Sequence, residues 1–323
     1  LAAVLLYSEN LEGRIVGGKP AGNGDVPYTV SLRRSWNNEH FCGGSLITNK
    51  HVLTAAHCVY YSWGGPLPAF TIYVVAGQIK LETNGSSIYR EASNIIAHPQ
   101  YNTKNLINDV AIIEINSAFS LTKSIATVTL KMEPVISGSC QVSGWGYQKF
   151  GADQLSPILM IADVKIMDFS TCYINYYERS NGSIVLDRGM ICAGHQQGKT
   201  DACGGDSGGP LTCNGLLAGV VSAGVGCANP DFPGIYANVP YYYDWILSKI
   251  NACSDCSTSK SVSEATSITE SSKFVIVTEG TVISFPFNVT NGKATGYVGC
   301  FNNFSFLLLL LLLPLMHAIL NYF

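Results

Sequence analysis

Three separated segments of the sequence carry residue types that can cleave a peptide bond. His57 ends the run Leu53-Thr54-Ala55-Ala56-His57, Asp109 opens the apolar run 110–113, and Ser207 lies among glycines. A hydroxyl attacks a carbonyl only after a base removes its proton, and a neutral imidazole is such a base near pH 7. A buried carboxylate can orient that imidazole and stabilise its protonated form. Each residue alone has an ordinary structural explanation, but together they predict a serine nucleophile with backbone amides as oxyanion donors.

The elements that would position these residues are short strands. Between about residues 15 and 250, β-rich runs alternate with turns that are rich in Gly, Pro, Asn and Ser. Many short strands separated by turn signals indicate an all-β sandwich or barrel. The clearest runs are Thr71–Ala76, Val110–Ile115, Ser139–Trp145 and Leu216–Ser222, and helical periodicity is scarce before Tyr241–Ile250.

The composition limits the class of protein. Of the 323 residues, 47% are hydrophobic, which is enough for a sizeable core. The formal net charge is only -3 and no basic stripe is present, so we expect no nucleic-acid partner. The 11 cysteines are dispersed, which is typical of disulfides in an oxidising compartment, and no Cys/His cluster indicates zinc. We therefore expect neither a metal nor another cofactor.

Two further features favour an extracellular location. Residues 1–7 look like the end of a signal-peptide apolar region, although an ordinary apolar segment has the same composition. Asn-x-Ser/Thr sequons, which glycosylation requires, occur at Asn84, Asn181, Asn288 and Asn303. We expect glycans at Asn84, Asn181 and Asn288.

Five motifs in a fixed order resemble those of the chymotrypsin/trypsin family of serine endopeptidases, and the resemblance extends from about Arg14 to Ile250. They are Arg14-Ile15-Val16-Gly17-Gly18, Thr54-Ala55-Ala56-His57-Cys58, Asp109-Val110-Ala111, Ser143-Gly144-Trp145-Gly146 and Gly205-Asp206-Ser207-Gly208-Gly209-Pro210. The resemblance implies two six-stranded antiparallel β-barrels, a C-terminal helix and an active site between the barrels. It implies His57 as general base, Asp109 as orienting carboxylate and Ser207 as nucleophile, with the amides of Gly205 and Ser207 as the oxyanion hole.

The same resemblance implies synthesis as a zymogen. Cleavage after Arg14 by an activating protease would free an α-amino group at Ile15, which would fold inward and pair with Asp206. A buried ammonium and a buried carboxylate each need the other, so the pair cannot form before cleavage.

Specificity for Arg or Lys is implied by Asp201, six residues before the nucleophile. In trypsin-like members of the family, an aspartate at this position lies at the base of the primary pocket, where it attracts a cation and rejects apolar side chains. Gly224 and Gly234 match two wall positions that must lack side chains, and Ser222 begins the substrate-binding strand. Ala202 offers no hydroxyl, which mildly favours Arg over Lys. A protease of elastase or chymotrypsin preference is the alternative that Asp201 argues against.

Two residues depart from the family pattern. The substrate-binding strand usually reads Ser-Trp-Gly, whereas here it reads Ser222-Ala223-Gly224, which puts the outer subsites in doubt. Gly204 replaces a long polar side chain at the pocket rim, so we expect a more open cleft there. The family's calcium loop would lie near residues 77–87, but its one acidic residue, Glu82, does not predict a calcium site.

Matching the family's positions implies four disulfides and leaves three cysteines. The implied pairs are Cys42–Cys58, Cys140–Cys213, Cys172–Cys192 and Cys203–Cys227, and the remaining cysteines are Cys253, Cys256 and Cys300.

The C-terminal part of the chain changes in composition. Residues 257–272 are typical of a linker or O-glycosylated stalk, 273–300 are β-like, and 304–320 are apolar with no basic flank. The apolar tail predicts either a glycosylphosphatidylinositol signal or a membrane span. A protease domain followed by a stalk and such a tail is similar to the layout of prostasin- and testisin-like membrane-anchored proteases. We therefore expect a signal-peptide remnant and activation propeptide (1–14), a protease domain (15–252), a stalk with a short β-like segment (253–300) and a hydrophobic tail (301–323).

The expected partners follow from this assignment. They are protein or peptide substrates, an activating protease, protein protease inhibitors and a membrane contacted through the tail. A catalytically impaired homologue that acts as a cell-surface binding module is the alternative, although no residue of the triad is missing.

Overall fold

A computed structural model describes residues 15–61, 63–82, 88–195, 197–251, 272–278 and 281–287. The chain divides into two units, Leu1–Ser259 and Lys260–Phe323. Several predicted features lie outside the described residues. They are Arg14, Asn84, Asn288, Asn303, the cysteines Cys253, Cys256 and Cys300, and the apolar tail.

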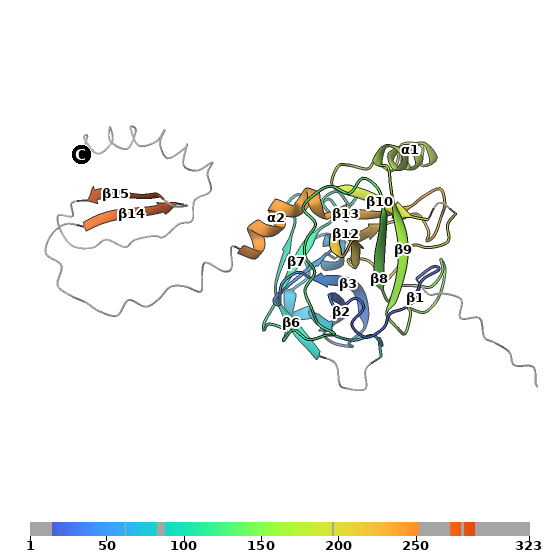
Figure 1. Cartoon of the computed structure of the whole chain (residues 1–323), viewed down its shortest axis with the longest axis horizontal. Helices are drawn as coiled ribbons and strands as arrows, with labels where there is room; N and C mark the ends of the chain where they lie inside the picture. The colour runs from blue at the N-terminus through green and yellow to red at the C-terminus, as the bar shows by residue number, and fades with distance from the viewer. Residues whose placement is uncertain are drawn as a thin grey trace, which may run out of the picture. The chain divides into compact units, whose positions relative to one another are not determined.

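Six antiparallel strands of the first unit form a closed β-barrel (Figure 1). Their order around the barrel is β2-β3-β4-β7-β6-β5, and β2 pairs with β5 to close it. Along β2, Val30 and Leu32 are completely buried, as a strand facing a barrel core requires. The strands are β2 Thr29–Arg34, β3 His40–Leu46, β4 His51–Thr54, β5 Ile72–Ala76, β6 Ile88–Ala97 and β7 Ala111–Ile115.

Six further strands form a second closed barrel, in the order β9-β10-β13-β12-β11-β8, with β8 paired to β9. The short strand β1 Lys19–Pro20 adds to the outer edge of β9. The prediction of two six-stranded antiparallel barrels is confirmed. The strands are β8 Ser139–Gly144, β9 Met160–Met167, β10 Met190–Gly194, β11 Pro210–Cys213, β12 Leu216–Ala223 and β13 Gly234–Asn238.

The described residues of the first unit also form two α-helices and two short 3₁₀ helices. The predicted C-terminal helix is present as α2 Val239–Asn251. The helix α1 Phe169–Arg179 was not predicted, because it buries only Cys172 and Tyr176 and so has little apolar periodicity. The Asp168 side chain caps it by accepting a hydrogen bond from the Thr171 amide at 2.9 Å. The 3₁₀ helices are η1 Ala56–Val59 and η2 Ala69–Thr71.

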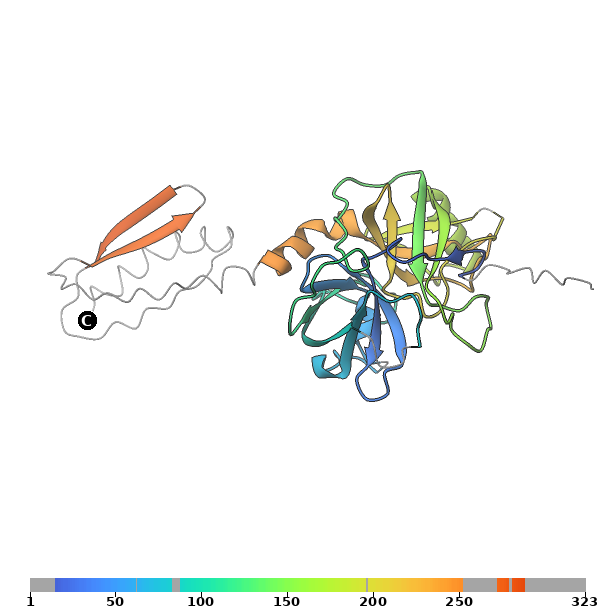
Figure 2. The ribbon, with the colours of Figure 1, turned by 60° about the horizontal axis from the view of Figure 1, so that its bottom comes forward.

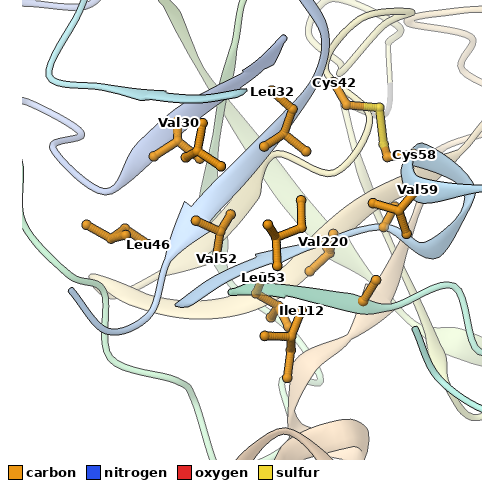
Figure 3. Packing of buried hydrophobic residues seen from close by; sticks show 14 of the residues in the cluster. Val30, Leu32, Cys42, Leu46, Val52, Leu53, Cys58, Val59, Ile112 and Val220 are labelled. Atoms are coloured by element: carbon orange, nitrogen blue, oxygen red, sulfur yellow. A yellow bond between two sulfur atoms is a disulfide. The ribbon is translucent and has the colours of Figure 1, made fainter. Parts of the chain in front are cut away.

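The two barrels lie against each other (Figure 2) and share part of a core. Val220 of β12 packs in the same cluster as Leu53 of β4 and Ile112 of β7, and Figure 3 shows this packing beside the Cys42–Cys58 disulfide. A buried hydrogen bond of 2.8 Å joins the hydroxyls of Thr29 on β2 and Ser143 on β8. The relative position of the barrels is therefore determined by dense apolar packing and by polar contacts between strands.

The second unit contains a described hairpin, in which β14 Ser272–Thr278 pairs antiparallel with β15 Thr281–Phe287. Except for Ser272, both strands lie within the segment 273–300, which the sequence predicted to be β-like. Among the described residues, no helix has the length and apolar character needed to cross a membrane.

Packing in the first barrel should carry much of the stability of the protease unit. Leu53 is completely buried on β4, so Leu53→Ala should lower the free energy of unfolding by about 2–5 kcal/mol through lost apolar burial and a residual cavity. Ile136 is 82% exposed, so Ile136→Ala should change the free energy of unfolding by less than about 0.5 kcal/mol. Urea unfolding with the disulfides intact measures both, and equal losses would contradict the assignment of the core.

Candidate active site

His57 and Asp109 meet between the two barrels. Asp109 Oδ2 lies 2.7 Å from His57 Nδ1, and Asp109 Oδ1 accepts a hydrogen bond of 2.8 Å from the His57 backbone amide. Asp109 is 2% exposed, whereas the His57 side chain is 25% exposed. Because the carboxylate accepts at Nδ1, the ring carries its proton there and leaves Nε2 free to act as a base.

The backbone at Asn108 and hydrogen bonds from Tyr242 and Ser222 hold Asp109 and its neighbour in place. Asn108, just before it, has a positive φ of 59°, a conformation that Asn tolerates better than most residues. Tyr242 of α2 donates to Asn108 Oδ1 at 3.2 Å. Ser222 of β12 donates from its hydroxyl to Asp109 Oδ2 at 2.6 Å. Ser222, predicted as a substrate-binding residue, thus also satisfies the buried carboxylate from the second barrel.

The protein environment of His57 favours the protonated imidazole more than bulk water does, so the pKa of the ring is raised. Burial by itself lowers the pKa of His57, but the negative charge of Asp109 and the hydrogen bond from the ring to it outweigh burial. The net effect raises the pKa of His57 above its usual value. This imidazole is a stronger base than an isolated histidine, which suits it to accept the proton of a hydroxyl.

Ser207 lies in a tight loop that packs against the disulfide next to His57. The Gly43 amide donates to the Ser207 carbonyl at 2.7 Å. Gly208 has a φ of 79°, and a Cβ there would overlap the Thr54 hydroxyl and the Gly43 carbonyl and approach Cys58 Sγ. Only glycine therefore lets this loop approach the 42–58 disulfide so closely.

No hydrogen bond joins the Ser207 hydroxyl to His57 among the described residues, and the Cys58 sulfur lies 3.7 Å from Nε2. Hydrogen bonds between catalytic groups are often long or poorly aligned before a substrate binds. The loop that carries Ser207 thus packs beside Cys58, the neighbour of His57 in the sequence, with no hydrogen bond from Ser207 to His57 among the described residues.

A chain of buried polar groups holds the predicted oxyanion loop at Gly205. Arg33 Nε donates to the Ser31 hydroxyl at 3.0 Å, and Ser31 Oγ lies 2.8 Å from His40 Nδ1. His40 Nε2 lies 2.9 Å from the Gly205 carbonyl, so Nε2 carries the proton. Burial lowers the pKa of His40 to about 4, which keeps the ring neutral at physiological pH.

Asp206, next to the predicted nucleophile Ser207, is completely buried among backbone amides. Its Oδ1 accepts from the Gly146 amide at 2.7 Å and its Oδ2 from the Cys203 amide at 2.9 Å. A Cβ on Gly144 or Gly146 would overlap this carboxyl group, which explains both glycines of the Ser-Gly-Trp-Gly motif. Burial raises the pKa of Asp206 to about 7, since no side-chain cation pairs with it among the described residues.

Beside Ser207 lies a pocket of about 170 Å³ that Asp201, Gly224 and Gly234 help to line. Asp201 is 4% exposed, and its Oδ2 accepts from the Ala228 amide at 2.9 Å. Its Oδ1 is buried and has no hydrogen-bond partner among the described residues. A Cβ on Gly234 would lie 2.8 Å from this oxygen, and one on Gly224 would lie 3.6 Å from the Gly226 carbonyl oxygen, an ordinary contact distance.

The pocket therefore has a buried acceptor with room above it. Burial raises the pKa of Asp201 to about 7, with a smaller contribution from the charge of Asp206. A cation that entered the pocket would pair with Oδ1 and favour the ionised carboxylate.

The structure also contains site residues that the sequence analysis missed. Tyr236 has a buried hydroxyl without a partner among the described residues, and its pKa is raised by burial and then by the charge of Asp201. His40 was missed because its role depends on Gly205, which is far away in the sequence. At the rim, the Tyr147 ring lies where a Cβ on Gly204 would come within 2.9 Å of it. No short sequence pattern marks any of these contacts.

The site offers no convincing metal ligands among the described residues. Cys42, His57 and Cys58 lie within ligand distance of one another, but the two cysteines form a disulfide and cannot supply thiolates. The four disulfides of the described chain are the pairs that the resemblance implies: Cys42–Cys58, Cys140–Cys213, Cys172–Cys192 and Cys203–Cys227.

Comparisons with known proteins all match this chain to trypsins. The family model named Trypsin matches residues 15–246. A trypsin of Sus scrofa is 37% identical over 243 residues, which cover 75% of this chain and 97% of that protein. Cationic trypsin-3 of Rattus norvegicus is 38% identical over 253 residues, which cover 78% of this chain and 95% of that protein. Trypsin Blo t 3 of Blomia tropicalis is 38% identical over 244 residues.

The hydrogen bonds of Asp109 can be tested by Asp109→Asn, which removes the charge and presents an amide to His57. We expect kcat for peptide hydrolysis to fall by about 10⁴-fold, because the ring then adopts the wrong tautomer. The base is active only when neutral, so activity is lost as pH falls through the pKa of His57. Without the Asp109 charge that pKa falls, and the rise of residual kcat/KM with pH should move to lower pH.

Asp163→Asn, at an exposed carboxylate on β9, is the matched control and should leave both the rate and the pH profile unchanged. An Asp109→Asn enzyme with a rate within tenfold of the parent would contradict the assigned role.

Proposed function

This chain belongs to the trypsin family of serine endopeptidases, and from that premise we propose that it hydrolyses proteins and peptides after Arg or Lys. The observation that carries the specificity is Asp201 Oδ1, which is buried in a pocket that Ser207 also lines and accepts no hydrogen bond from any described residue. A guanidinium or ammonium would supply the missing hydrogen bonds and the opposite charge. An apolar side chain would leave a buried carboxylate unpaired, which is costly.

The chemistry proceeds through an acyl-enzyme. Ser207 Oγ bonds to the scissile carbonyl carbon while His57 Nε2 accepts the hydroxyl proton, and Asp109 stabilises the resulting imidazolium. The carbonyl electron pair moves to oxygen, where the amides of Gly205 and Ser207 bind the oxyanion. Collapse breaks the C–N bond, and His57 returns the proton to the departing amine. Water then repeats these steps on the ester and releases the new carboxyl terminus.

Activation by cleavage after Arg14 is the second part of the proposal. Ile15 is completely buried in the second barrel's core, and the Asp201 amide donates to the Val16 carbonyl at 3.3 Å. Asp206 is buried and pairs with no side-chain cation of the described residues, so a new α-ammonium at Ile15 would supply a positive charge to pair with it. This pairing would order the loop that carries Gly205 and Ser207.

The backbone conformation of Ile15 also supports activation by cleavage after Arg14. Its φ is 56°, a conformation that is strongly disfavoured for a β-branched residue. Such strain costs on the order of 1–3 kcal/mol. The strain depends on the peptide bond to Arg14, which cleavage removes. Cleavage would thus release strain at the residue that gains the new charge.

We also propose an extracellular setting. Four disulfides are typical of oxidising compartments, and Asn181, in one of the predicted glycosylation sequons, is exposed. Protein substrates, an activating protease and protein inhibitors are the proposed partners. Membrane attachment through the C-terminal tail, by a lipid or a span, is a proposal that rests on the sequence of residues 304–320 alone.

The specificity is tested by Asp201→Ser in the enzyme cleaved after Arg14. Loss of the buried carboxylate should lower kcat/KM for an Arg peptide by about 10⁴-fold, with little change for a matched Phe peptide. The parent enzyme should strongly prefer Arg over Phe or Ala. A parent that cleaves only the Phe or Ala peptide would keep the chemistry and contradict the specificity. No cleavage of any peptide would favour a catalytically impaired binding module.

Activation is tested by Arg14→Gln, which removes the predicted cleavage residue while leaving Ile15 and Asp206 in place. An arginine-specific protease should convert the parent chain to an active form that begins at Ile15, and the variant should remain inactive. N-terminal sequencing and a peptide assay before and after treatment measure both. Equal activity of parent and variant without cleavage would contradict zymogen control.

A further inference from the structure

Three aromatic side chains form a row along helix α1, on the outside of the second barrel (Figure 1). Phe169, Tyr173 and Tyr177 follow one another at intervals of four residues, so they lie on one side of the helix. The Tyr173 and Tyr177 rings are stacked, with their centroids 5.8 Å apart and their planes at 8°. Phe169 is 37% exposed and Tyr177 is 46% exposed. The row therefore presents apolar surface to solvent, and covering that surface would stabilise the helix.

The turn that ends α1 brings Asn181 next to the last ring of this row. The Gly182 amide donates to the Tyr177 carbonyl at 2.7 Å, and the Asn181 amide donates to the Glu178 carbonyl at 3.2 Å. These two bonds, with a φ of 53° at Asn181, are the Schellman arrangement that commonly ends a helix. A Cβ built on Gly182 would lie 3.4 Å from the Tyr177 ring. The residue that follows Asn181 thus packs directly against Tyr177.

Asn181 is also the acceptor residue of the sequon Asn181-Gly182-Ser183, and it is exposed. An N-linked glycan begins with an N-acetylglucosamine joined to the asparagine side chain. Such a sugar has C–H groups on the faces of its ring, and these groups carry partial positive charge that the negative face of an aromatic ring attracts. Because the sugar is tethered one residue from the Tyr177 contact, it needs little further ordering to reach the ring.

We propose that Asn181 carries an N-glycan whose first sugar packs on the Tyr177 ring and covers this end of the aromatic row. The inference rests on the proposed extracellular setting and does not depend on catalysis. The sugar holds the turn 180–183 against α1, because it contacts the same ring that Gly182 contacts. A protein partner docked on the row is the alternative occupant, but it has no comparable tether at this position.

The test compares secreted, uncleaved full-length chains with and without the sugar on Asn181. An endoglycosidase that leaves one sugar at each occupied site gives the first form, and Ser183→Ala, which removes the sequon and keeps Asn181, gives the second. Peptide mass spectrometry measures occupancy. All four tryptophans lie between residues 36 and 245, so tryptophan fluorescence follows unfolding of the first unit. Ser183→Ala should lower the Tm by about 2–4 °C, and trimming to one sugar should leave the Tm unchanged.

A double-mutant cycle separates the contact with Tyr177 from other effects of Ser183→Ala. The Ser183 hydroxyl donates to the Ser180 carbonyl at 2.7 Å, so its loss has a cost of its own. That cost is common to both arms of the cycle and cancels. The change in Tm on Ser183→Ala should fall by at least half in a Tyr177→Ser chain. It should persist in a Tyr241→Ser chain, the matched control, because Tyr241 is 56% exposed on α2.

Hydrogen exchange gives a local measurement in case the turn opens before the rest of the unit unfolds. The Gly182 amide should exchange at least about threefold more slowly with one sugar on Asn181 than without it, and Tyr177→Ser should abolish the difference. The same chains made with N-glycosylation blocked should show no coupling between residues 177 and 183.

An unoccupied Asn181 in the secreted chain would overturn this inference. Stabilisation by the sugar that is equal in the parent and in Tyr177→Ser would place its contact elsewhere and also overturn it. A sugar that changes neither the Tm nor the exchange of Gly182 would leave the row open to a protein partner and contradict the proposal. A chain that never enters the secretory pathway would overturn the extracellular setting and this inference together, whereas a secreted chain without protease activity would overturn only the proposed catalysis.

Discussion

Burial of three carboxylates around Ser207 is the constraint on which the rest of the site depends. Asp109 is satisfied by the amide and ring of His57 and by the Ser222 hydroxyl, and it orients the base. Within the part of the chain that the structure describes, Asp206 is held by two backbone amides and pairs with no side-chain cation, and Asp201 Oδ1 has no hydrogen-bond partner. Burying an unpaired charge costs free energy, so each of these carboxylates needs a partner of its own. We propose that these partners are the His57 imidazole for Asp109, the new terminus at Ile15 for Asp206 and the substrate cation for Asp201.

The two barrels make this arrangement possible because both contribute residues to the site. His57 and Asp109 come from the first barrel, whereas Ser207 and Ser222 come from the second. Val220 packs into the core of the first barrel, and the Thr29–Ser143 hydrogen bond crosses the boundary. His40 extends from β3 to the Gly205 carbonyl, so the first barrel also supports the oxyanion loop of the second. Residues at the boundary between the barrels therefore both stabilise the packing of the barrels and position the residues of the site.

The sequence, with its resemblance to the family, predicted the barrels, the C-terminal helix, the four disulfide pairs and the contact of His57 with Asp109. Those features have local signals, such as Gly-Asp-Ser-Gly or an aspartate before an apolar strand. The roles of His40 and Tyr236 have no such signal, because each depends on a partner distant in the chain. Helix α1 was missed because only two of its residues are buried. Replacement of an aromatic residue by Ala223 predicted altered subsites, but only the structure shows that Ala223 and the segment 183–186 line one cavity.

The most direct test of the central claim is to locate the acyl-enzyme. The chain is cleaved after Arg14, mixed with an ester of a guanidino-substituted acid and analysed by mass spectrometry of its peptides. Our account predicts one acyl group per molecule, attached to Ser207, and none in uncleaved chain or in the Asp201→Ser variant. An acyl group on another residue, or none on a chain that begins at Ile15, would contradict it.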